Sequence, residues 1–148
     1  ASLRGGGDMM QLRFRRRRWR PSAVVMICDI SGSMSRYSRL LLHFAHALAN
    51  QRAQVHAFVF GTRLTNITRY LRQSDPDVAL ENALEAVDDW SGGTRIGASL
   101  HCFNHEWSRR ILGQGATIVL ITHDMEIARK CPRVVSIRDG KIVEDGAA

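Results

Sequence analysis

Three short apolar runs, each as long as a β-strand, constrain the fold of this chain more than any other feature. They occupy residues 23–29 (AVVMICD), 54–60 (QVHAFVF) and 116–122 (ATIVLIT). The first and third runs are almost continuously apolar, which is typical of strands that are covered on both faces. Stretches with helical spacing lie between the runs. Strands that alternate with helices predict an open, mostly parallel sheet with helices on both faces.

The stretches between the runs supply the other elements of a Rossmann-like α/β fold. Apolar residues recur at helical spacing within 36–50 and predict a helix that packs through one apolar face. That face consists of Tyr37, Leu40, Leu41, Phe44 and Leu48. Asp75 and Pro76 are suited to the N-cap and the first position of a helix over 76–87. Further elements are expected within 62–71 (an edge strand or hairpin arm), 97–111 and 125–130 (helices), and 133–138 and 141–144 (strands).

A basic arm precedes the first predicted strand and carries most of the net charge of +7. Its arginines are Arg13, Arg15, Arg16, Arg17, Arg18 and Arg20. With these six charges set aside, the rest of the chain is close to neutral. Phe14 and Trp19 lie among the arginines, a pattern that favours stacking on bases or contact with an acidic partner. A solvated arm is the simpler interpretation, and nucleic-acid binding is not favoured because no recognition module accompanies the run.

Cysteine usage and hydropathy indicate the compartment. The chain has three cysteines, an odd number, and no C-x-x-C spacing. This argues against a disulfide framework and fits a reducing, cytoplasmic environment. No apolar run approaches the roughly 18 residues that a membrane-spanning helix needs, so we expect no membrane span.

A candidate ligand-binding turn follows the first predicted strand. In open α/β sheets, ligands bind at the carboxyl ends of the strands. Here the sequence is Asp29-Ile30-Ser31-Gly32-Ser33, and the alternation places the Asp29, Ser31 and Ser33 oxygens on one side of the turn. One carboxylate and two hydroxyls are hard donors that suit Mg²⁺ with part of its water shell retained. The alternative is that Ser31 or Ser33 only caps the following helix.

The stretch DISGSMSRYSRLLLHFAHAL resembles the start of a von Willebrand factor A (VWA) domain, whose metal-ion-dependent adhesion site begins with D-x-S-x-S. It is particularly similar to the CoxE-like bacterial VWA family. The resemblance continues through VHAFVFGTRLTNITRYL, DPDVAL and DWSGGTRIGASL, and covers roughly residues 8–121.

The resemblance implies a Mg²⁺ or Mn²⁺ site made by Asp29, Ser31 and Ser33, joined by Thr94 from the GGT loop. An ion held by few carboxylates keeps positive charge and an open position, which an acidic side chain of a partner protein can fill. The family suggests a MoxR-type AAA+ ATPase as that partner, in metalloenzyme assembly. No nucleophile–base pair is expected, so the site is interpreted as one for recognition, not for catalysis.

The chain departs from the VWA pattern after the third strand. VWA domains of this type usually carry an Asp there, whereas this chain has Thr122-His123-Asp124. His123 takes the position of the expected carboxylate. Two arrangements stay open: the His123 imidazole acts as a hydrogen-bond acceptor behind the ligands, or Asp124 bends back to supply the carboxylate.

The tail, about residues 116–146, resembles the C-terminal end of an ABC transporter ATPase domain. The matching sequence is TIVLITHDMEIARKCPRVVSIRDGKIVEDG. In that family the corresponding histidine contacts the γ-phosphate of ATP, which would assign this role to His123 and makes an ATP-binding module the alternative function. However, the chain contains no G-x-x-x-x-G-K-[ST] loop to hold the phosphates.

We therefore expect a chimeric organisation. Residues 1–21 form the basic arm and residues 22–122 form the VWA-like metal-binding domain. Residues 123–148 form an ABC-like tail that completes the same sheet.

One further pair of possible metal ligands lies in the predicted helix over 97–111. His101 and His105 are four residues apart and therefore share a helix face, which is a spacing compatible with zinc. Because a third ligand is missing, a solvated polar face is the favoured interpretation.

Overall fold

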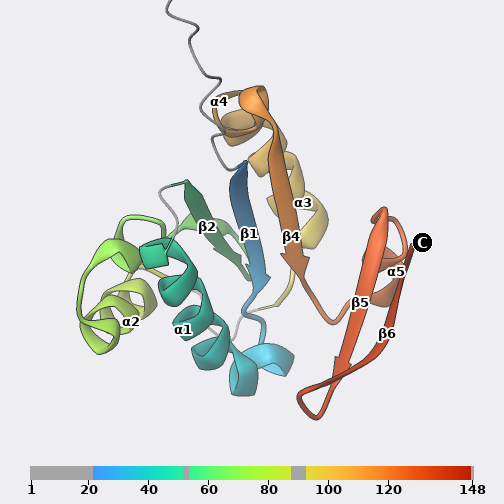
Figure 1. Ribbon diagram of the computed structural model, residues 1–148, viewed down its shortest axis with the longest axis horizontal. Helices are drawn as coiled ribbons and strands as arrows, with labels where there is room; N and C mark the ends of the chain where they lie inside the picture. Colours follow the sequence, from blue (N-terminus) through green and yellow to red (C-terminus); the bar gives the residue numbers. More distant parts are fainter. Residues whose placement is uncertain (1–21, 52–53, 88–92, 148) are drawn as a thin grey trace, which may run out of the picture.

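A four-stranded sheet forms the centre of the protein in a computed structural model that describes residues 22–51, 54–87 and 93–147 (Figure 1). The basic arm lies outside the described residues. The strands are β1 (Ala23–Asp29), β2 (Val55–Phe60), β3 (Leu64–Asn66) and β4 (Ala116–Ile121). Their order is β3-β2-β1-β4. β1 pairs in parallel with β2 and β4, and β3 pairs antiparallel with β2, which confirms the predicted Rossmann-like, mostly parallel sheet.

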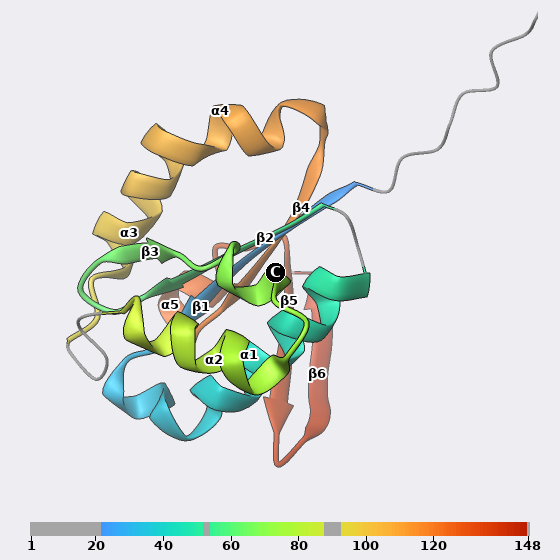
Figure 2. The same ribbon diagram turned by 90° about the vertical axis from the view of Figure 1, so that its left-hand side faces the viewer.

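Helices cover both faces of this sheet (Figure 2). α1 (Ser35–Gln51) and α2 (Pro76–Glu85) lie on one side, and α3 (Ile96–Cys102) and α4 (Ser108–Ile111) lie on the other. α2 begins as predicted, because the side chain of Asp75 accepts hydrogen bonds from the backbone of Asp77 and Val78 at 2.9 and 3.3 Å. This capping satisfies two of the free N–H groups in the first turn of the helix.

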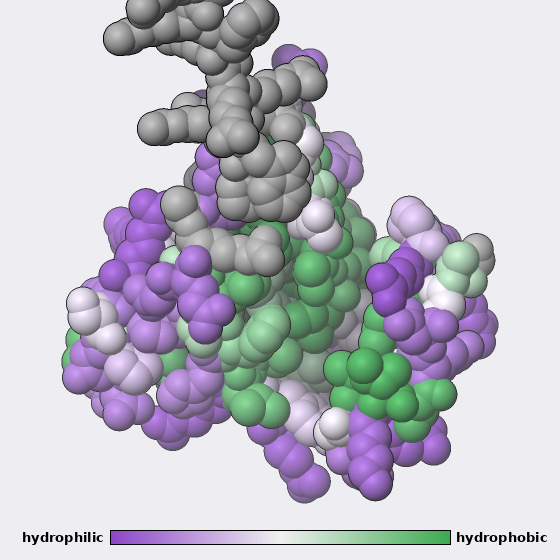
Figure 3. All heavy atoms as spheres, viewed as in Figure 1, coloured by the Kyte–Doolittle hydropathy of each residue, from purple (hydrophilic) through white to green (hydrophobic). Residues whose placement is uncertain are grey.

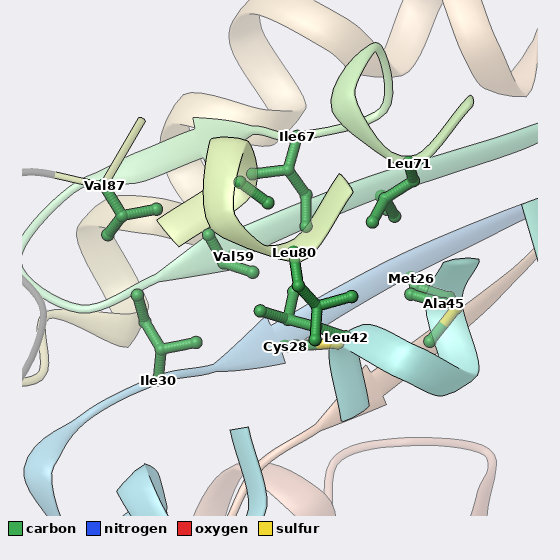
Figure 4. Packing of buried hydrophobic residues seen from close by; sticks show 12 residues of the cluster. Met26, Cys28, Ile30, Leu42, Ala45, Val59, Ile67, Leu71, Leu80 and Val87 are labelled. Atoms are coloured by element: carbon green, nitrogen blue, oxygen red, sulfur yellow. The ribbon is translucent and has the colours of Figure 1, made fainter. Parts of the chain in front are cut away.

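The alternation of side chains along β1 produces two hydrophobic cores. Met26 and Cys28 belong to the core between the sheet and α1 and α2, part of which is shown in Figure 4. Val25 and Ile27 belong to the second core, beneath α3 and α4. All four side chains are buried. β1 is therefore covered on both faces, as its continuous apolar sequence predicts.

The predicted inner face of α1 is correct for Leu48, which packs against the core, but wrong for three of its other members. Tyr37, Leu40 and Phe44 are exposed, with 52%, 66% and 55% of their surface accessible. The buried residues of the helix are Ser38, Leu42, Ala45 and His46. Apolar residues occur on more than one side of this helix, so their spacing alone does not select a face. The small Ser38 and Ala45 permit close packing, and a hydrogen bond of 2.8 Å between His46 Nε2 and the Gln73 carbonyl satisfies the buried imidazole.

The predicted helix over 97–111 is present but contains a π-helical turn at Phe103–Trp107 between α3 and α4. The rings of Phe103 and Trp107 both pack edge-on against Phe58 of β2, with centroids 5.2 and 5.3 Å away. Such edge-to-face contacts are a favoured aromatic geometry. They fix α3 and α4 to the second face of the sheet.

The tail does not complete the sheet, so this expectation is wrong. After the short α5 (Met125–Ala128), the strands β5 (Arg133–Arg138) and β6 (Lys141–Ala147) pair with each other in a separate antiparallel sheet. Asp139 and Gly140, with φ of 51° and 74°, form the tight turn between them. A two-residue turn of this kind favours local pairing of its two strands.

β4 is consequently an edge strand, not a strand covered on both faces as predicted. Ile118 and Val119 on β4 are 47% and 39% exposed. Ile137 and Ile142 on the hairpin are exposed as well. Figure 3 shows apolar side chains gathered on this side of the molecule, between the helices and the hairpin. Within the described ranges, no helix is both long and apolar enough to cross a membrane.

Candidate functional site

The candidate site forms where β1 and β4 end side by side. The register pairs Cys28 with Ile121, so the residues that follow these two, Asp29 and Thr122, lie at the same edge of the sheet. His123 comes directly after. β2 ends at this edge too, because Asp29 is in register with Phe60. The loops that leave the three strands can therefore bring polar groups together at the carboxyl end of the sheet, as is usual in open α/β folds.

A closed set of hydrogen bonds connects Asp29, Ser31, Ser33 and His123. Asp29 Oδ1 accepts from the Ser31 backbone N–H at 2.8 Å. Asp29 Oδ2 lies 3.0 Å from His123 Nδ1, and His123 Nε2 lies 3.0 Å from Ser33 Oγ. Ser33 Oγ lies 3.0 Å from Ser31 Oγ. The structure thus brings together three of the predicted ligands and adds the imidazole to them; these four residues are called the Asp29 cluster below.

The Asp29 cluster runs from the interior of the domain to its surface. Asp29 is fully buried and Ser31 is almost so, whereas Ser33 is exposed and the His123 side chain is 49% exposed. An ionised carboxylate only accepts hydrogen bonds, so Nδ1–H of His123 donates to Asp29. With a neutral ring, Nε2 then accepts from the Ser33 hydroxyl. The site presents polar groups to solvent above one buried negative charge.

The other predicted ligands take different positions. Thr94 is exposed and takes no part in the hydrogen bonds of the Asp29 cluster. The backbone N–H of the neighbouring Arg95 donates to the Gly61 carbonyl at 2.9 Å, which holds this loop next to the end of β2. Asp124 does not bend back toward Asp29: its Oδ1 accepts from the backbone of Glu126 and Ile127 and thereby caps α5.

Thr122 is a member of the site that the sequence interpretation missed. Its hydroxyl donates to Asp29 Oδ2 over 3.5 Å and accepts the Asp124 backbone N–H at 3.0 Å. The signal for it was available, since two parallel strands that are adjacent place their following residues together. The contact between His123 and Ser33 was missed too, because it depends on the direction of the loop after β4.

The chemistry of the donors decides which ions the site fits. Asp29 is the one carboxylate in the cluster, the two serine hydroxyls are weak neutral donors, and the imidazole supplies nitrogen. In the described part of the chain, no group of three or more His, Cys, Asp or Glu side chains is placed to hold a metal ion. If the cluster held a divalent cation, its one carboxylate and two hydroxyls would leave most of the coordination to water.

Two other groups with reactive side-chain types lie outside the Asp29 cluster. Burial raises the pKa of the Cys28 thiol to about 12, and the charge of Asp29 acts in the same direction. Cys28 is therefore an unreactive core residue. His101 and His105 stack with their ring centroids 6.4 Å apart on the opposite helical layer.

The order Ser33–His123–Asp29 is also that of a nucleophile, a base and an orienting carboxylate. The sequence interpretation expected no nucleophile–base pair, and the hydrogen bonds between these three side chains do not by themselves make one. Acyl transfer additionally requires oxyanion donors and a substrate cleft. A hollow of about 500 Å³ lies instead at the sheet edge near β3, and its lining includes Asn66, Arg72 and Trp107 but none of the Asp29 cluster.

An open α/β sheet with a carboxylate and hydroxyls at the carboxyl end of its central strand defines a Rossmann-like domain with polar groups at the edge where such sheets bind ligands. A family model described as "VWA domain containing CoxE-like protein" matches residues 1–136. The chain belongs to this family, whose members are VWA-type protein-interaction domains and are generally accessory and non-catalytic.

Curated proteins match only part of the chain. The macrolide export ATP-binding/permease protein MacB of Nitrosomonas europaea is 52% identical over 80 residues, which are 54% of this chain and 11% of that protein. MacB of Hyphomonas neptunium is 39% identical over 69 residues, 45% of this chain and 10% of that protein. The pyoverdine export ATP-binding/permease protein PvdT of Pseudomonas entomophila is 50% identical over 38 residues, which are 26% of this chain and 6% of that protein.

The chain thus spans about a tenth or less of the length of these relatives. Their partial coverage agrees with the tail that resembles an ABC ATPase. No solved structure matches the chain significantly.

Proposed function

We propose that this domain binds a protein partner through a divalent cation held at the Asp29 cluster, with Mg²⁺ or Mn²⁺ as the ions that the family suggests. The observation that supports this proposal is the convergence of Asp29, Ser31 and Ser33 at the carboxyl edge of the sheet, within one hydrogen-bonded set. Thr94 would join them from beside Arg95, whose backbone N–H donates to the Gly61 carbonyl after β2. An acidic side chain of the partner would complete the coordination.

The residues of the chain have separate tasks in this function. Asp29 is anchored by the Ser31 backbone and supplies the negative charge that attracts the cation. Ser31 and Ser33 are neutral and leave much of the ion's charge uncompensated. The bound ion supplies the Lewis acidity that draws a partner's carboxylate. A MoxR-type AAA+ ATPase is the proposed partner, in the assembly of a metalloenzyme.

Calorimetry tests the cation site directly. Titration of the full chain with Mg²⁺ and Mn²⁺ should give saturable heats that Asp29→Ala abolishes. Asp77→Ala is the matched control, because Asp77 is an exposed carboxylate in the first turn of α2, away from the cluster. Equal heats for the wild type and Asp29→Ala would contradict a cation at this cluster.

Partner binding is tested with the immobilised full chain and a MoxR-type ATPase in solution. We expect retention of the ATPase in Mn²⁺ or Mg²⁺, its release by EDTA, and no retention on Asp29→Ala. Retention that survives both EDTA and the substitution would contradict a cation-dependent interface.

An ATP-binding module is the alternative function, supported by the similarity to the ATP-binding/permease proteins. In this chain, however, His123 contacts Asp29 and Ser33, and the sequence has no phosphate-binding G-x-x-x-x-G-K-[ST] loop. Heats from ATP in the absence of divalent ions, unchanged in Asp29→Ala, would favour this alternative.

Hydrolysis of p-nitrophenyl acetate tests for catalysis. If the proposed function is correct, the wild type and Ser33→Ala should hydrolyse the ester at the same rate. A rate that falls to background in Ser33→Ala but stays unchanged in Ser74→Ala, an exposed serine that precedes α2, would establish a catalytic Ser33 instead.

A further inference from the structure

The hollow near β3 is a second place where polar side chains gather, apart from the Asp29 cluster. Its volume is about 500 Å³, and its lining includes His56, Asn66, Thr68, Arg69, Arg72 and Trp107. These residues come from β2, from β3 and the segment that follows it, and from the π-helical turn before α4. Sites for small molecules in proteins are usually concave, with volumes of about 300–1,000 Å³. The hollow therefore has room for a small organic molecule.

The charge of the hollow is positive. Arg69 and Arg72 are exposed, and neither forms an ion pair with a carboxylate of the described residues. The described lining contains no Asp or Glu. Burial lowers the pKa of His56, and the charge of Arg72 acts in the same direction, which indicates that this guanidinium lies close to the ring. Two arginines that no described carboxylate neutralises thus line one hollow, which favours an anion as its ligand.

Arg69 is held in place without a ligand. Its guanidinium carbon lies 4.5 Å from the centre of the Tyr70 ring, and one of its nitrogens donates to the Tyr70 hydroxyl. A cation–π contact of this kind is favourable. The hydrogen bond uses one of the five N–H donors of the guanidinium, so the others are left for a ligand. Because the side chain is already ordered, binding costs less conformational entropy.

The hydrogen-bond acceptors of the lining are already in use. Asn66 Oδ1 accepts from the Thr68 backbone N–H at 3.0 Å. Thr68 Oγ1 accepts from the Ala57 backbone N–H at 3.0 Å and donates to the Ala57 carbonyl at 3.3 Å. The amide nitrogen of Asn66 is thereby left as a donor beside the two guanidinium groups. The hollow is therefore richer in free donors than in free acceptors, which again favours an anion.

Trp107 adds an apolar wall to the hollow. Its half-buried ring packs edge-on against Phe58, with the ring centroids 5.3 Å apart, and this contact fixes its orientation. An indole ring offers a surface on which another ring or an apolar group can stack. The lining thus combines guanidinium groups for an anion with an aromatic surface for an organic group.

We propose that this hollow binds a small phosphorylated molecule, with its phosphate held by Arg69 and Arg72 and its organic part against Trp107. A phosphate monoester carries about 1.5 to 2 negative charges at pH 7 and has three strong acceptor oxygens. Guanidinium groups bind phosphate through two parallel hydrogen bonds. A carboxylate has one charge and two oxygens, so it would leave more of these donors unpaired. The inference goes beyond the proposed function, because it needs neither the Asp29 cluster nor a divalent cation.

Calorimetry on the full chain in a buffer with EDTA tests this inference. The probes are AMP, ribose 5-phosphate and inorganic phosphate, with hexaglutamate as a carboxylate probe. AMP should give saturable heats and bind more tightly than inorganic phosphate, because its organic part contacts Trp107. Arg69→Gln and Arg72→Gln should each weaken AMP binding at least about tenfold, because each removes a charged hydrogen-bond donor.

Arg39→Gln is the matched control, since Arg39 is an exposed arginine of α1, on the other side of the sheet. It removes the same charge and should leave AMP binding unchanged. Asp29→Ala should leave it unchanged as well, so the hollow and the Asp29 cluster are tested independently. Because Arg69 and Arg72 are exposed, their variants should fold, and circular dichroism verifies this.

Three results would overturn the inference. One is the absence of saturable heats from every phosphate probe, and another is saturable binding of hexaglutamate alone. The third is AMP binding that is equally strong in the wild type and in both variants of the hollow, because the phosphate would then bind elsewhere on this basic chain. ATP titrations also separate the hollow from the alternative ATP-binding function: loss of the heats in Arg72→Gln assigns them to the hollow, whereas unchanged heats in both variants contradict the inference.

Discussion

Phe58 is the residue whose truncation should have the largest effect on the stability of the fold. It is fully buried on β2, and the rings of Phe103 and Trp107 pack edge-on against it. Truncation of a buried Phe to Ala costs about 3–5 kcal/mol, and each aromatic pair adds about 0.5–1.5 kcal/mol beyond the area that it buries. Domains are generally stable by about 5–15 kcal/mol. Phe58→Ala should therefore lower the free energy of unfolding by at least about 3–5 kcal/mol, a large share of the stability of a domain.

Urea denaturation followed by circular dichroism measures this cost. Two variants serve as controls. Phe58→Leu keeps most of the volume and should lose roughly 1–2 kcal/mol, chiefly from the two aromatic pairs. Phe44→Ala removes a phenylalanine that is 55% exposed on α1 and should change the free energy of unfolding by less than about 0.5 kcal/mol. If Phe58→Ala and Phe44→Ala cost the same, the packing of α3 and α4 on the sheet described above is incorrect.

Three further predictions concern other parts of the chain. Cys28 should not react with a thiol reagent at pH 8 until the protein unfolds, whereas the half-buried Cys131 should react in the native state. Mass spectrometry locates the labelled cysteine, and rapid labelling of Cys28 would contradict its burial. Asp75→Ala should lower the free energy of unfolding by about 1 kcal/mol in the same urea assay, because α2 loses its cap. A hydrogen bond from Arg133 lowers the pKa of Asp145 from its ordinary value of 3.8. This hairpin contact should therefore be present above pH 3.8 and be lost as the pH falls through the lowered pKa. An NMR titration in which the Asp145 carboxyl shows its ordinary midpoint would refute this prediction.

The sequence predicted the elements of the fold closely but not all of their partners. The apolar run at β1 and the Asp75–Pro76 start of α2 depend on local patterns, and both were correct. The inner face of α1 was correct only in part, because Leu40 and Leu42 lie on different sides of the helix and tertiary packing selects between them. The separate β5–β6 sheet forms because a tight turn joins its two strands. No local sequence pattern shows that these strands pair with each other and not with the larger sheet.

The candidate site, too, was predicted from the sequence only where its residues are neighbours in the chain. Asp29, Ser31 and Ser33 belong to one turn, and their proximity follows from five consecutive residues. His123 and Thr122 join them from a loop more than 90 residues away, and their exact contacts depend on how β4 registers against β1. The approach of Thr94 to the Asp29 cluster when an ion is bound stays a prediction.

The pairing of β1 with β4 determines when the site can form as the chain folds. The contact between Asp29 and His123 spans 94 residues, and Ala23 pairs with Ala116. Contacts at such separations form slowly, because a long loop must close before they contribute free energy. At a synthesis rate of about 5–20 residues per second, β1 waits several seconds on the ribosome for its second neighbour. Until then the Asp29 carboxylate lacks its imidazole partner, so a nascent chain that displays the first turn has not yet acquired the finished site.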